Sequence, residues 1–199
     1  MERWVTRFRK VCFYLKNVFI IRKIGYGVFM FGPYRIDGGQ NIRLGKGTVF
    51  QRGAWLYSVA TSGTKASLSI GQGCVFGYNN HIAAVGEMVF GDYVLTANNV
   101  YISDNLHEYE DITRPILHQP VRFKAPVSIG SGSWIGENVS IISASIGKNC
   151  VIGANSVVTS DVPDYSVAVG APARVIKQYN LKTRKWQKVD SVSKRAGKK

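Results

Sequence analysis

The chain has 199 residues, 45% of them hydrophobic, which suffices for one domain with a sizeable core. Its net charge of +14 is concentrated at the ends: residues 1–23 carry seven Lys or Arg and residues 174–199 carry ten, each against one acidic residue, while the middle is near neutral. The three cysteines are odd in number and far apart, which argues against a disulfide framework or a zinc site and indicates a reducing, cytoplasmic compartment.

Residues 1–33 form a basic segment that we predict to contain an amphipathic helix up to about residue 23. Its apolar positions recur three or four residues apart, at Trp4, Phe8, Val11 or Cys12, Leu15 and Phe19. The apolar stretch is only about eleven residues long, too short to span a bilayer, and no small-residue cleavage site for a signal peptide follows it. Cationic residues beside an aromatic face suit an anionic membrane surface. The alternative is a helix that only covers the end of the next domain.

Residues 34–177 repeat a six-residue unit with an apolar first position, most clearly in the second half. The units begin at Ile36 and Ile42, at Leu44, Phe50 and Leu56, at Ile70, Phe76 and Ile82, at Phe90, Thr96 and Ile102, at Ile129, Ile135 and Ile141, and at Ile146, Ile152 and Val158. Six fits neither a helix face nor a long strand alternation, but it fits a chain that turns a corner every six residues. Three sides close a triangular coil of about eighteen residues, and several coils must stack to bury their apolar positions.

We therefore predict an all-β parallel β-helix, with an antiparallel sandwich as the alternative. Residues 103–126 interrupt the repeat and are polar, so we expect a loop that protrudes from the stack and carries function. The basic tail, residues 178–199, is predicted to begin as a short helix and to be disordered from residue 191. A basic run alone is weak support for nucleic-acid binding, so no nucleic-acid partner is expected. Anionic lipid suits the tail as well.

The stretch from Val127 to Thr159, with its Trp134-Ile135-Gly136 unit, and the closing Gly170-Ala171-Pro172-Ala173-Arg174 resemble the hexapeptide-repeat acyltransferases. The resemblance covers roughly residues 36–178. It is closest to the galactoside, maltose and nodulation-factor acetyltransferases and to the sugar O-acetyltransferases of polysaccharide gene clusters. It implies a left-handed coil and a homotrimer with active sites between subunits. The left hand rests on the resemblance alone, since crossover connections are usually right-handed.

Such enzymes transfer an acyl group from a thioester to a hydroxyl, which requires a general base with a pKa near 7. Histidine is the natural choice, and the resemblance places the base in the protruding loop, at His107. His118, in the same loop, is a competitor, and His81 is expected at a corner or groove. Carbonic anhydrases of this fold bind metal through histidines, but the spacings here do not match theirs, so no metal is expected.

Asp104 and Glu110 are candidates to orient His107 through its second ring nitrogen, as is a backbone carbonyl, and we assign Asp104 to the substrate site. Asn79 aligns with a substrate-contacting asparagine of the galactoside acetyltransferases. An amide both donates to and accepts from sugar hydroxyls. The alternative for Asn79 is a corner residue in the left-handed backbone region.

The donor implied by the resemblance is acetyl-CoA. Trp134 matches the tryptophan beside the pantetheine groove, and Ala154, Thr159 and Arg174 align with positions lining the rest of that site. Ser160 stands where relatives often have lysine, which removes one cation from the expected nucleotide end.

The sequence thus predicts a cytoplasmic acetyl-CoA-dependent O-acetyltransferase that modifies a sugar of a surface polysaccharide or its lipid-linked precursor. The inner face of the cell membrane is the alternative location for such an enzyme. An N-acetyltransferase acting on an amino sugar is the alternative within the same class. A non-catalytic repeat scaffold at the membrane surface is the alternative from another class, and such a scaffold would need neither His107 nor Trp134.

Overall fold

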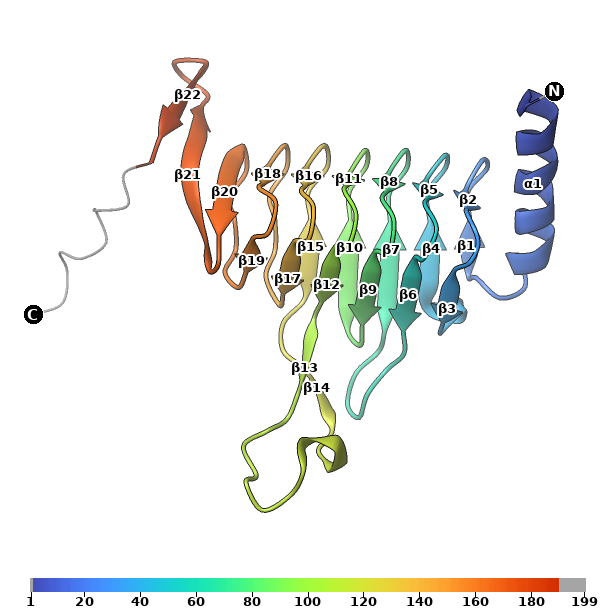
Figure 1. Cartoon of the computed structure of the whole chain (residues 1–199), viewed down its shortest axis with the longest axis horizontal. Coiled ribbons are helices and arrows are strands. Elements are labelled where there is room, and N and C mark those ends of the chain that lie inside the picture. The colour runs from blue at the N-terminus through green and yellow to red at the C-terminus, as the bar shows by residue number, and fades with distance from the viewer. Residues whose placement is uncertain (1, 190–199) are drawn as a thin grey trace, which may run out of the picture.

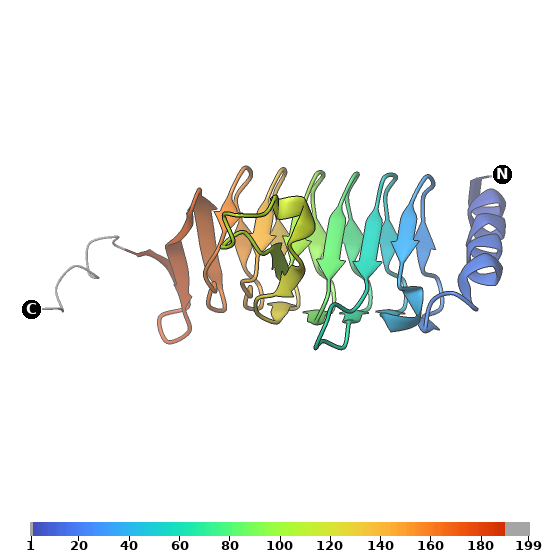
Figure 2. The same cartoon turned by 90° about the horizontal axis from the view of Figure 1, so that it is seen from below.

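In the computed structural model, which describes residues 2–189 and only the backbone of residues 2–7 and 9, the chain forms a row of stacked triangular coils (Figure 1). Helix α1 (Glu2–Asn17) stands across the N-terminal end of the row, and an antiparallel hairpin closes the other end. A two-stranded ribbon projects from the side of the stack (Figures 1 and 2). The predicted disorder of residues 191–199 falls outside the described residues.

Three parallel sheets make the sides of the coil. The first sheet holds β1 (Lys23–Ile24), β4 (Ile42–Leu44), β7 (Ser67–Ile70), β10 (Glu87–Phe90) and β15 (Val127–Ile129). The second holds β2 (Phe29–Met30), β5 (Val49–Phe50), β8 (Val75–Phe76), β11 (Leu95–Thr96), β16 (Trp134–Ile135), β18 (Val151–Ile152) and β20 (Ser166–Gly170). The third holds β3 (Arg35–Asp37), β6 (Trp55–Ser58), β9 (His81–Ala84), β12 (Tyr101–Ser103), β17 (Ser140–Ile142) and β19 (Val157–Val158). A short 3-10 turn, η1 (Gly39–Asn41), precedes β4.

The hexad positions fill the interior of this stack. Of the seventeen predicted first positions, sixteen are at most 4% exposed, and Ile36 is partly buried against the core. They pack on their equivalents in the neighbouring coils: the Phe50 and Phe76 rings stack 4.4 Å apart, and Phe90 meets Phe76 edge-on at 5.5 Å. The parallel pairing of all three sheets confirms the predicted β-helix and excludes the antiparallel sandwich.

The coil begins earlier than residue 34. Strands β1 and β2 pair in parallel with β4 and β5, so residues 23–37 make a complete first coil. Ile24 and Met30 precede Ile36 at six-residue steps and continue the hexad, and Met30 is only 2% exposed. The glycines and aromatic residues between them hid this phase in the sequence.

Helix α1 covers the open end of the first coil, but not with the apolar stripe that the sequence predicted. The opposite side of the helix faces the coil. Phe13 is buried and meets the rings of Phe29 and Tyr34 at 5.9 and 5.7 Å. Asn17 donates to the Phe13 carbonyl and to the Tyr34 hydroxyl. The predicted apolar stripe instead faces outward, since the Leu15 side chain is 63% exposed. Within residues 2–189, no helix has the length and apolar character needed to cross a membrane.

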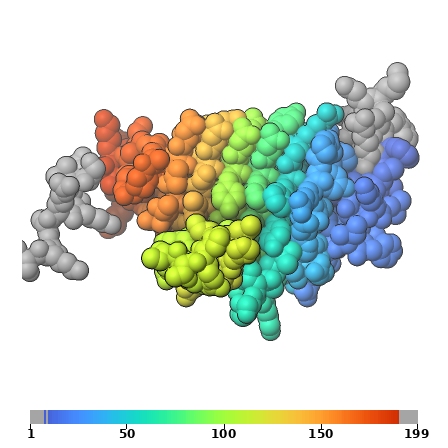
Figure 3. All heavy atoms as spheres, turned by 60° about the horizontal axis from the view of Figure 1, so that its bottom comes forward, coloured from blue at the N-terminus to red at the C-terminus, as the bar shows by residue number. Residues whose placement is uncertain are grey.

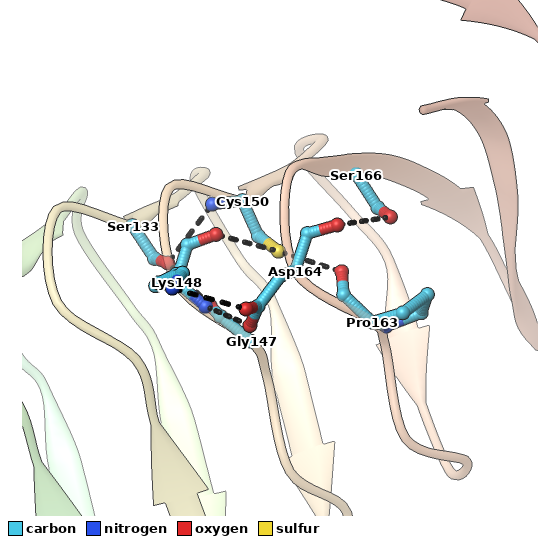
Figure 4. Close-up of polar contacts among 7 residues, drawn as sticks. All are labelled: Ser133, Gly147, Lys148, Cys150, Pro163, Asp164 and Ser166. Atoms are coloured by element: carbon cyan, nitrogen blue, oxygen red, sulfur yellow. Dashed lines mark hydrogen bonds and ion pairs between the residues drawn. The ribbon is translucent and has the colours of Figure 1, made fainter. Parts of the chain in front are cut away.

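Polar side chains fasten one coil to the next at the corners (Figure 4). The Ser133 hydroxyl donates to the Gly147 carbonyl at 2.8 Å and accepts from the Cys150 amide at 3.0 Å. The Lys148 amide donates to the Asp164 carboxylate at 2.9 Å, and the buried Cys150 thiol donates to a carbonyl of the following coil. Burial raises the pKa of the Cys150 thiol, and that of Cys74 at the equivalent corner, so both stay protonated and structural.

The start of the tail is a strand and not the predicted helix. Strand β21 (Ala173–Asn180) turns back on β20, and β22 (Lys185–Lys188) pairs with β21, both antiparallel. The Tyr179 and Trp186 rings meet edge-on at 5.5 Å across this hairpin. Without β21, the last coil would end in a sheet edge with unpaired backbone N–H and C=O groups. Pairing with β21 satisfies these groups, and this gain outweighs the local preference of the segment for a helix.

The stacking of hexad side chains predicts a large stability loss at one internal position. Replacing Phe50, which is fully buried, by Ala should lower the free energy of unfolding by about 3–5 kcal/mol, because a cavity replaces the contact with Phe76. Denaturant unfolding would measure this, with Phe19→Ala as the control because Phe19 is 95% exposed. Equal losses for the two variants would contradict the packing.

Candidate active site

The ribbon that interrupts the repeat is an ordered antiparallel pair. Strands β13 (Asn105–His107) and β14 (Val121–Phe123) leave the stack between β12 and β15, and His107 pairs with Val121. One residue further on, the Glu108 amide donates to the Pro120 carbonyl at 2.9 Å. His107 is exposed, yet its backbone belongs to a ladder, so its imidazole starts from a defined position.

The tip of the ribbon is also tied down. It contains the 3-10 turn η2 (Ile116–His118), and the Gln119 side chain donates to the Asp111 carbonyl at 2.9 Å. The Asp111 carboxylate accepts from the Thr113 amide and pairs with Arg114 at 2.7 Å. The hydrogen bonds from Thr113 and the nearby Arg114 guanidinium hold the pKa of Asp111 below its usual value.

The root of the ribbon is anchored by Asp104, whose side chain is fully buried. Its two carboxylate oxygens accept from the amides of Val85 and Gly86 at 2.9 and 2.8 Å. The neighbouring Asn105 amide group donates to the same carboxylate and to the Ala83 carbonyl. Asp104 therefore holds the turn between β9 and β10 against the ribbon.

The assignment of Asp104 to the substrate site stays a prediction. The burial of its side chain and the three hydrogen bonds that its carboxylate accepts favour a structural role instead. Its position supports the ribbon that carries His107. Glu110 is exposed on the ribbon, nearer the tip than His107.

A second segment flanks the ribbon root. Residues 59–66, which connect β6 to β7, protrude on the same side of the stack as the ribbon (Figure 3). The Thr64 hydroxyl of this segment donates to the Val85 carbonyl at 2.6 Å, and the Val85 amide donates to Asp104. Both protrusions thus share one anchoring turn.

The other two histidines lie elsewhere. His118 is exposed in η2 at the ribbon tip. His81 lies on the outer side of β9, stacked on Trp55 at 4.1 Å with the rings 1° from parallel, and Tyr101 lies 5.2 Å away in the next coil. Partial burial, and secondly the Arg35 charge, lower the pKa of His81 and favour its neutral form.

Asn79 is a corner residue. It has a φ of 55°, and its side-chain amide donates to Asn99 of the next coil at 3.2 Å. Asn99 donates to Asn138, which donates to Asn155, each over 3.1 Å, and all four have positive φ. Asparagine tolerates this left-handed backbone, so the ladder accounts for Asn79 without a ligand. The Asn79 side chain is still exposed at its outer edge.

The four donor-site candidates fall into separate groups. Trp134 points outward from β16 with 49% of its side chain exposed, and Ala154 lies on the corner just beyond, where a Cβ on Gly136 would come within 2.7 Å of the Ala154 amide. Thr159 follows β19 in the third sheet. The ribbon leaves the stack at the equivalent position two coils earlier, after β12. Arg174 is exposed in β21, where it pairs with Val169, and Val169 lies against Gly153 beside Ala154. Thr159, at the far end of β19, is set apart from these residues within one protomer.

Two features of the site region were missed in the sequence. Trp55, His81 and Tyr101 form an aromatic column on the outside of the third sheet, with the Arg35 guanidinium 4.5 Å from the Trp55 ring. They occupy the same register position in successive coils, which aligning the hexads would have found. The anchoring role of Asp104 had no sequence signal, because Val85 and Gly86 are paired to it only by the fold.

Within the described part of the chain, no three His, Cys, Asp or Glu side chains are grouped so that they could hold a metal ion.

Comparison with known sequences identifies the family. The profile described as "Hexapeptide repeat of succinyl-transferase" matches residues 126–160. WbbJ of Escherichia coli K12, named for O-acetyl transfer in lipopolysaccharide biosynthesis, is 34% identical over 143 residues, which span 64% of this chain and 73% of WbbJ. The chain belongs to the hexapeptide-repeat acyltransferases.

Other members of the family are similar over shorter shares of their length. The galactoside O-acetyltransferase of E. coli is 34% identical over 132 residues, covering 64% of this chain and 62% of that enzyme. A Mycobacterium tuberculosis protein named as an acetyltransferase is 44% identical over 118 residues, which are 59% of this chain but 39% of that protein. The chain thus spans slightly less than two thirds of the galactoside O-acetyltransferase and well under half of the M. tuberculosis protein.

The fold is shared with a solved structure. AntD, an N-acyltransferase from Bacillus cereus crystallised with dTDP and 3-hydroxybutyryl-CoA, superposes with a TM-score of 0.71 at 19% identity, over 86% of this chain and 90% of AntD. The parallel coil is therefore the left-handed β-helix that the hexapeptide-repeat resemblance implied.

The anchoring of the ribbon predicts that Asp104 contributes to stability. Asp104→Ala leaves the buried amides of Val85 and Gly86 without acceptors, which should cost about 2–4 kcal/mol of unfolding free energy. Denaturant unfolding measures the change, and Glu110→Ala, an exposed acidic residue of the same ribbon, should have little effect. A fully stable Asp104→Ala protein would contradict the anchoring role.

Proposed function

We propose that this chain is an acetyl-CoA-dependent O-acetyltransferase whose acceptor is a sugar hydroxyl of a surface polysaccharide or its lipid-linked precursor. The observation that carries the proposal is the placement of His107, an exposed imidazole on an ordered ribbon whose root is fixed by buried hydrogen bonds. The similarity to WbbJ and to a galactoside O-acetyltransferase supports a sugar hydroxyl as the acceptor.

His107 would act as the general base. As the acceptor oxygen attacks the thioester carbonyl, the imidazole takes the hydroxyl proton and a tetrahedral intermediate forms. Collapse of the intermediate breaks the carbon–sulfur bond, and His107 returns the proton to the coenzyme A sulfur as it leaves. The acetyl ester and free coenzyme A are the products, and His107 ends in its starting form. A backbone amide at a coil corner is the kind of group that would stabilise the oxyanion.

Direct transfer suits this chain better than a covalent acyl-enzyme. Cys74 and Cys150 are buried, and their raised pKa values keep them as thiols, which are poor nucleophiles. Cys12 is exposed on α1, at the end of the stack and three coils from the ribbon. All three cysteines are free, which supports a reducing, cytoplasmic setting.

The donor site would form between subunits of a homotrimer. Trp134 and Ala154 lie near one corner of the coil, while Thr159 shares the edge that carries the ribbon. A neighbouring copy would bring one group opposite the other, with Trp134 against the pantetheine arm and Arg174 near phosphate groups. Coenzyme A thioester binding by AntD supports this class of donor, and the acetyltransferase relatives favour an acetyl group. Asn79 would contact the acceptor only through its exposed outer edge.

Two alternatives make different use of the same structure. AntD is an N-acyltransferase, so an amino sugar is the alternative acceptor, and it would use the same base. A non-catalytic scaffold would transfer no acetyl group at all.

Substitution of His107 tests the proposal. Transfer of radiolabelled acetyl from acetyl-CoA would be measured to galactose, glucose, rhamnose, N-acetylglucosamine and glucosamine. His107→Asn should slow transfer by at least ~100-fold because the base is lost while folding is kept. His118→Asn is the matched control, since His118 is exposed on the same ribbon, and should retain wild-type rates.

Retention of most activity by His107→Asn would refute the assignment of the base. Faster transfer to glucosamine than to the other sugars would replace the O-acetyl proposal by its N-acetyl alternative. No transfer to any sugar by the folded wild-type protein would favour the scaffold.

A further inference from the structure

Helix α1 and the residues after it carry an exposed apolar face. We define the α1 apolar face by Phe8, Val11, Leu15, Phe19 and Ile20, which are 70, 55, 63, 95 and 50% exposed. The helical members lie three and four residues apart, so they share one side of the helix. Phe13, the anchor to the first coil, lies on the opposite side. Leu15 and Phe19 therefore look away from the body, while Phe8 and Val11 also border the space between the helix and the first coil.

A groove runs between α1 and the first coil. It has a volume of about 770 Å³ and is lined mainly by apolar and aromatic groups, among them Phe8, Val11, Tyr14, Tyr26 and Val28. Tyr26 is 79% exposed at its margin. The groove extends the apolar surface at this end of the molecule.

The same end is strongly basic. Between Glu2 and Asp37 the sequence contains no acidic residue, and eight Lys or Arg fall in that interval. Of these, Lys16, Arg22 and Lys23 are exposed beside the α1 apolar face. An exposed apolar stripe bordered by cations complements an anionic lipid surface, in which the apolar side chains enter the acyl boundary and the cations meet the headgroups.

We propose that the α1 end of the molecule docks on an anionic lipid bilayer, with α1 lying in the interface. A second copy of this chain is a poorer partner, because two surfaces of the same positive charge would repel each other. This surface is independent of acyl transfer, and neither His107 nor the donor candidates belong to it.

The orientation has a consequence for the acceptor. Helix α1 lies across the end of the row of coils, so docking through its outer side stands the row upright on the bilayer (Figure 1). The ribbon leaves the fourth coil, and coils stack roughly 4.8 Å apart, so the ribbon root would lie about 14 Å beyond the first coil. A sugar held by a lipid carrier could reach that height. This consequence, unlike the docking, rests on the proposed function.

Vesicle binding tests the docking. Cosedimentation of the full chain with phosphatidylcholine vesicles would be compared with vesicles containing about 30% phosphatidylglycerol, where we expect much stronger binding. The double variant Leu15→Ser/Phe19→Ser should weaken that binding by at least ~10-fold. Ile112→Ser/Leu117→Ser is the matched control, because these residues are 95 and 84% exposed at the ribbon tip, and its binding should be unchanged.

Substitution of basic residues provides a second test of vesicle binding. Lys16→Gln/Arg22→Gln/Lys23→Gln should also weaken binding to the anionic vesicles by at least ~10-fold, and added salt should have the same effect. Lys182→Gln/Arg184→Gln/Lys185→Gln removes the same charge from the exposed C-terminal hairpin and should leave binding unchanged.

Three outcomes would overturn the proposal. The first is no preference for anionic vesicles, and the second is loss of binding only in the C-terminal variant. The third is a change of oligomeric state in the Leu15→Ser/Phe19→Ser variant, measured by analytical ultracentrifugation, because it would show that the α1 apolar face is a contact between copies of the chain. Acetyl transfer to soluble sugars, measured on the same variants, should be unaffected. A failure of docking is therefore distinguishable from a failure of the enzymatic proposal.

Discussion

The structure depends on one constraint: no single coil of this chain can bury its own apolar side chains. Each hexad residue is covered by its equivalents in the coils before and after, as the stacked rings of Phe50 and Phe76 illustrate. The stack therefore needs a cover at both ends. Helix α1 provides one through Phe13, and β21 contributes to the other through Ala173 and Val175, which pack against the core. Both covers also carry the basic charge of the chain.

The ribbon formed by residues 103–126 stands out because the rest of the stack is regular. Corners are fastened by repeated devices, such as the asparagine ladder that begins at Asn79 and the serine and thiol bridges around Ser133 and Cys150. Against this background, the ribbon after β12 is the longest departure from the coil. Its root is fixed by the buried Asp104 carboxylate, which accepts from the amides of Val85 and Gly86 and so supports the strand that carries the exposed His107.

The sequence predicted what local periodicity encodes. The six-residue phase identified the parallel coil, its interior residues and the protruding segment, since each depends on residues close together in the chain. The six-residue phase could not show that Ile24 and Met30 already belong to the coil. Only the pairing of their strands with β4 and β5 in the fold shows this. Nor could the sequence separate the inner from the outer apolar side of α1, since both have helical spacing. The role of Asp104, and the separation of Thr159 from Trp134, arise from which coils become neighbours.

We propose that acetyl-CoA binds beside Trp134 on the outside of the coil. Isothermal titration of the purified protein with acetyl-CoA and with coenzyme A tests it most directly, with Trp186→Ala as the control, because Trp186 is 48% exposed and Trp134 is 49% exposed. We predict micromolar to sub-millimolar binding, weakened by Trp134→Ala and unchanged by Trp186→Ala. Absence of binding in the folded wild-type protein, or equal binding by Trp134→Ala, would contradict the account.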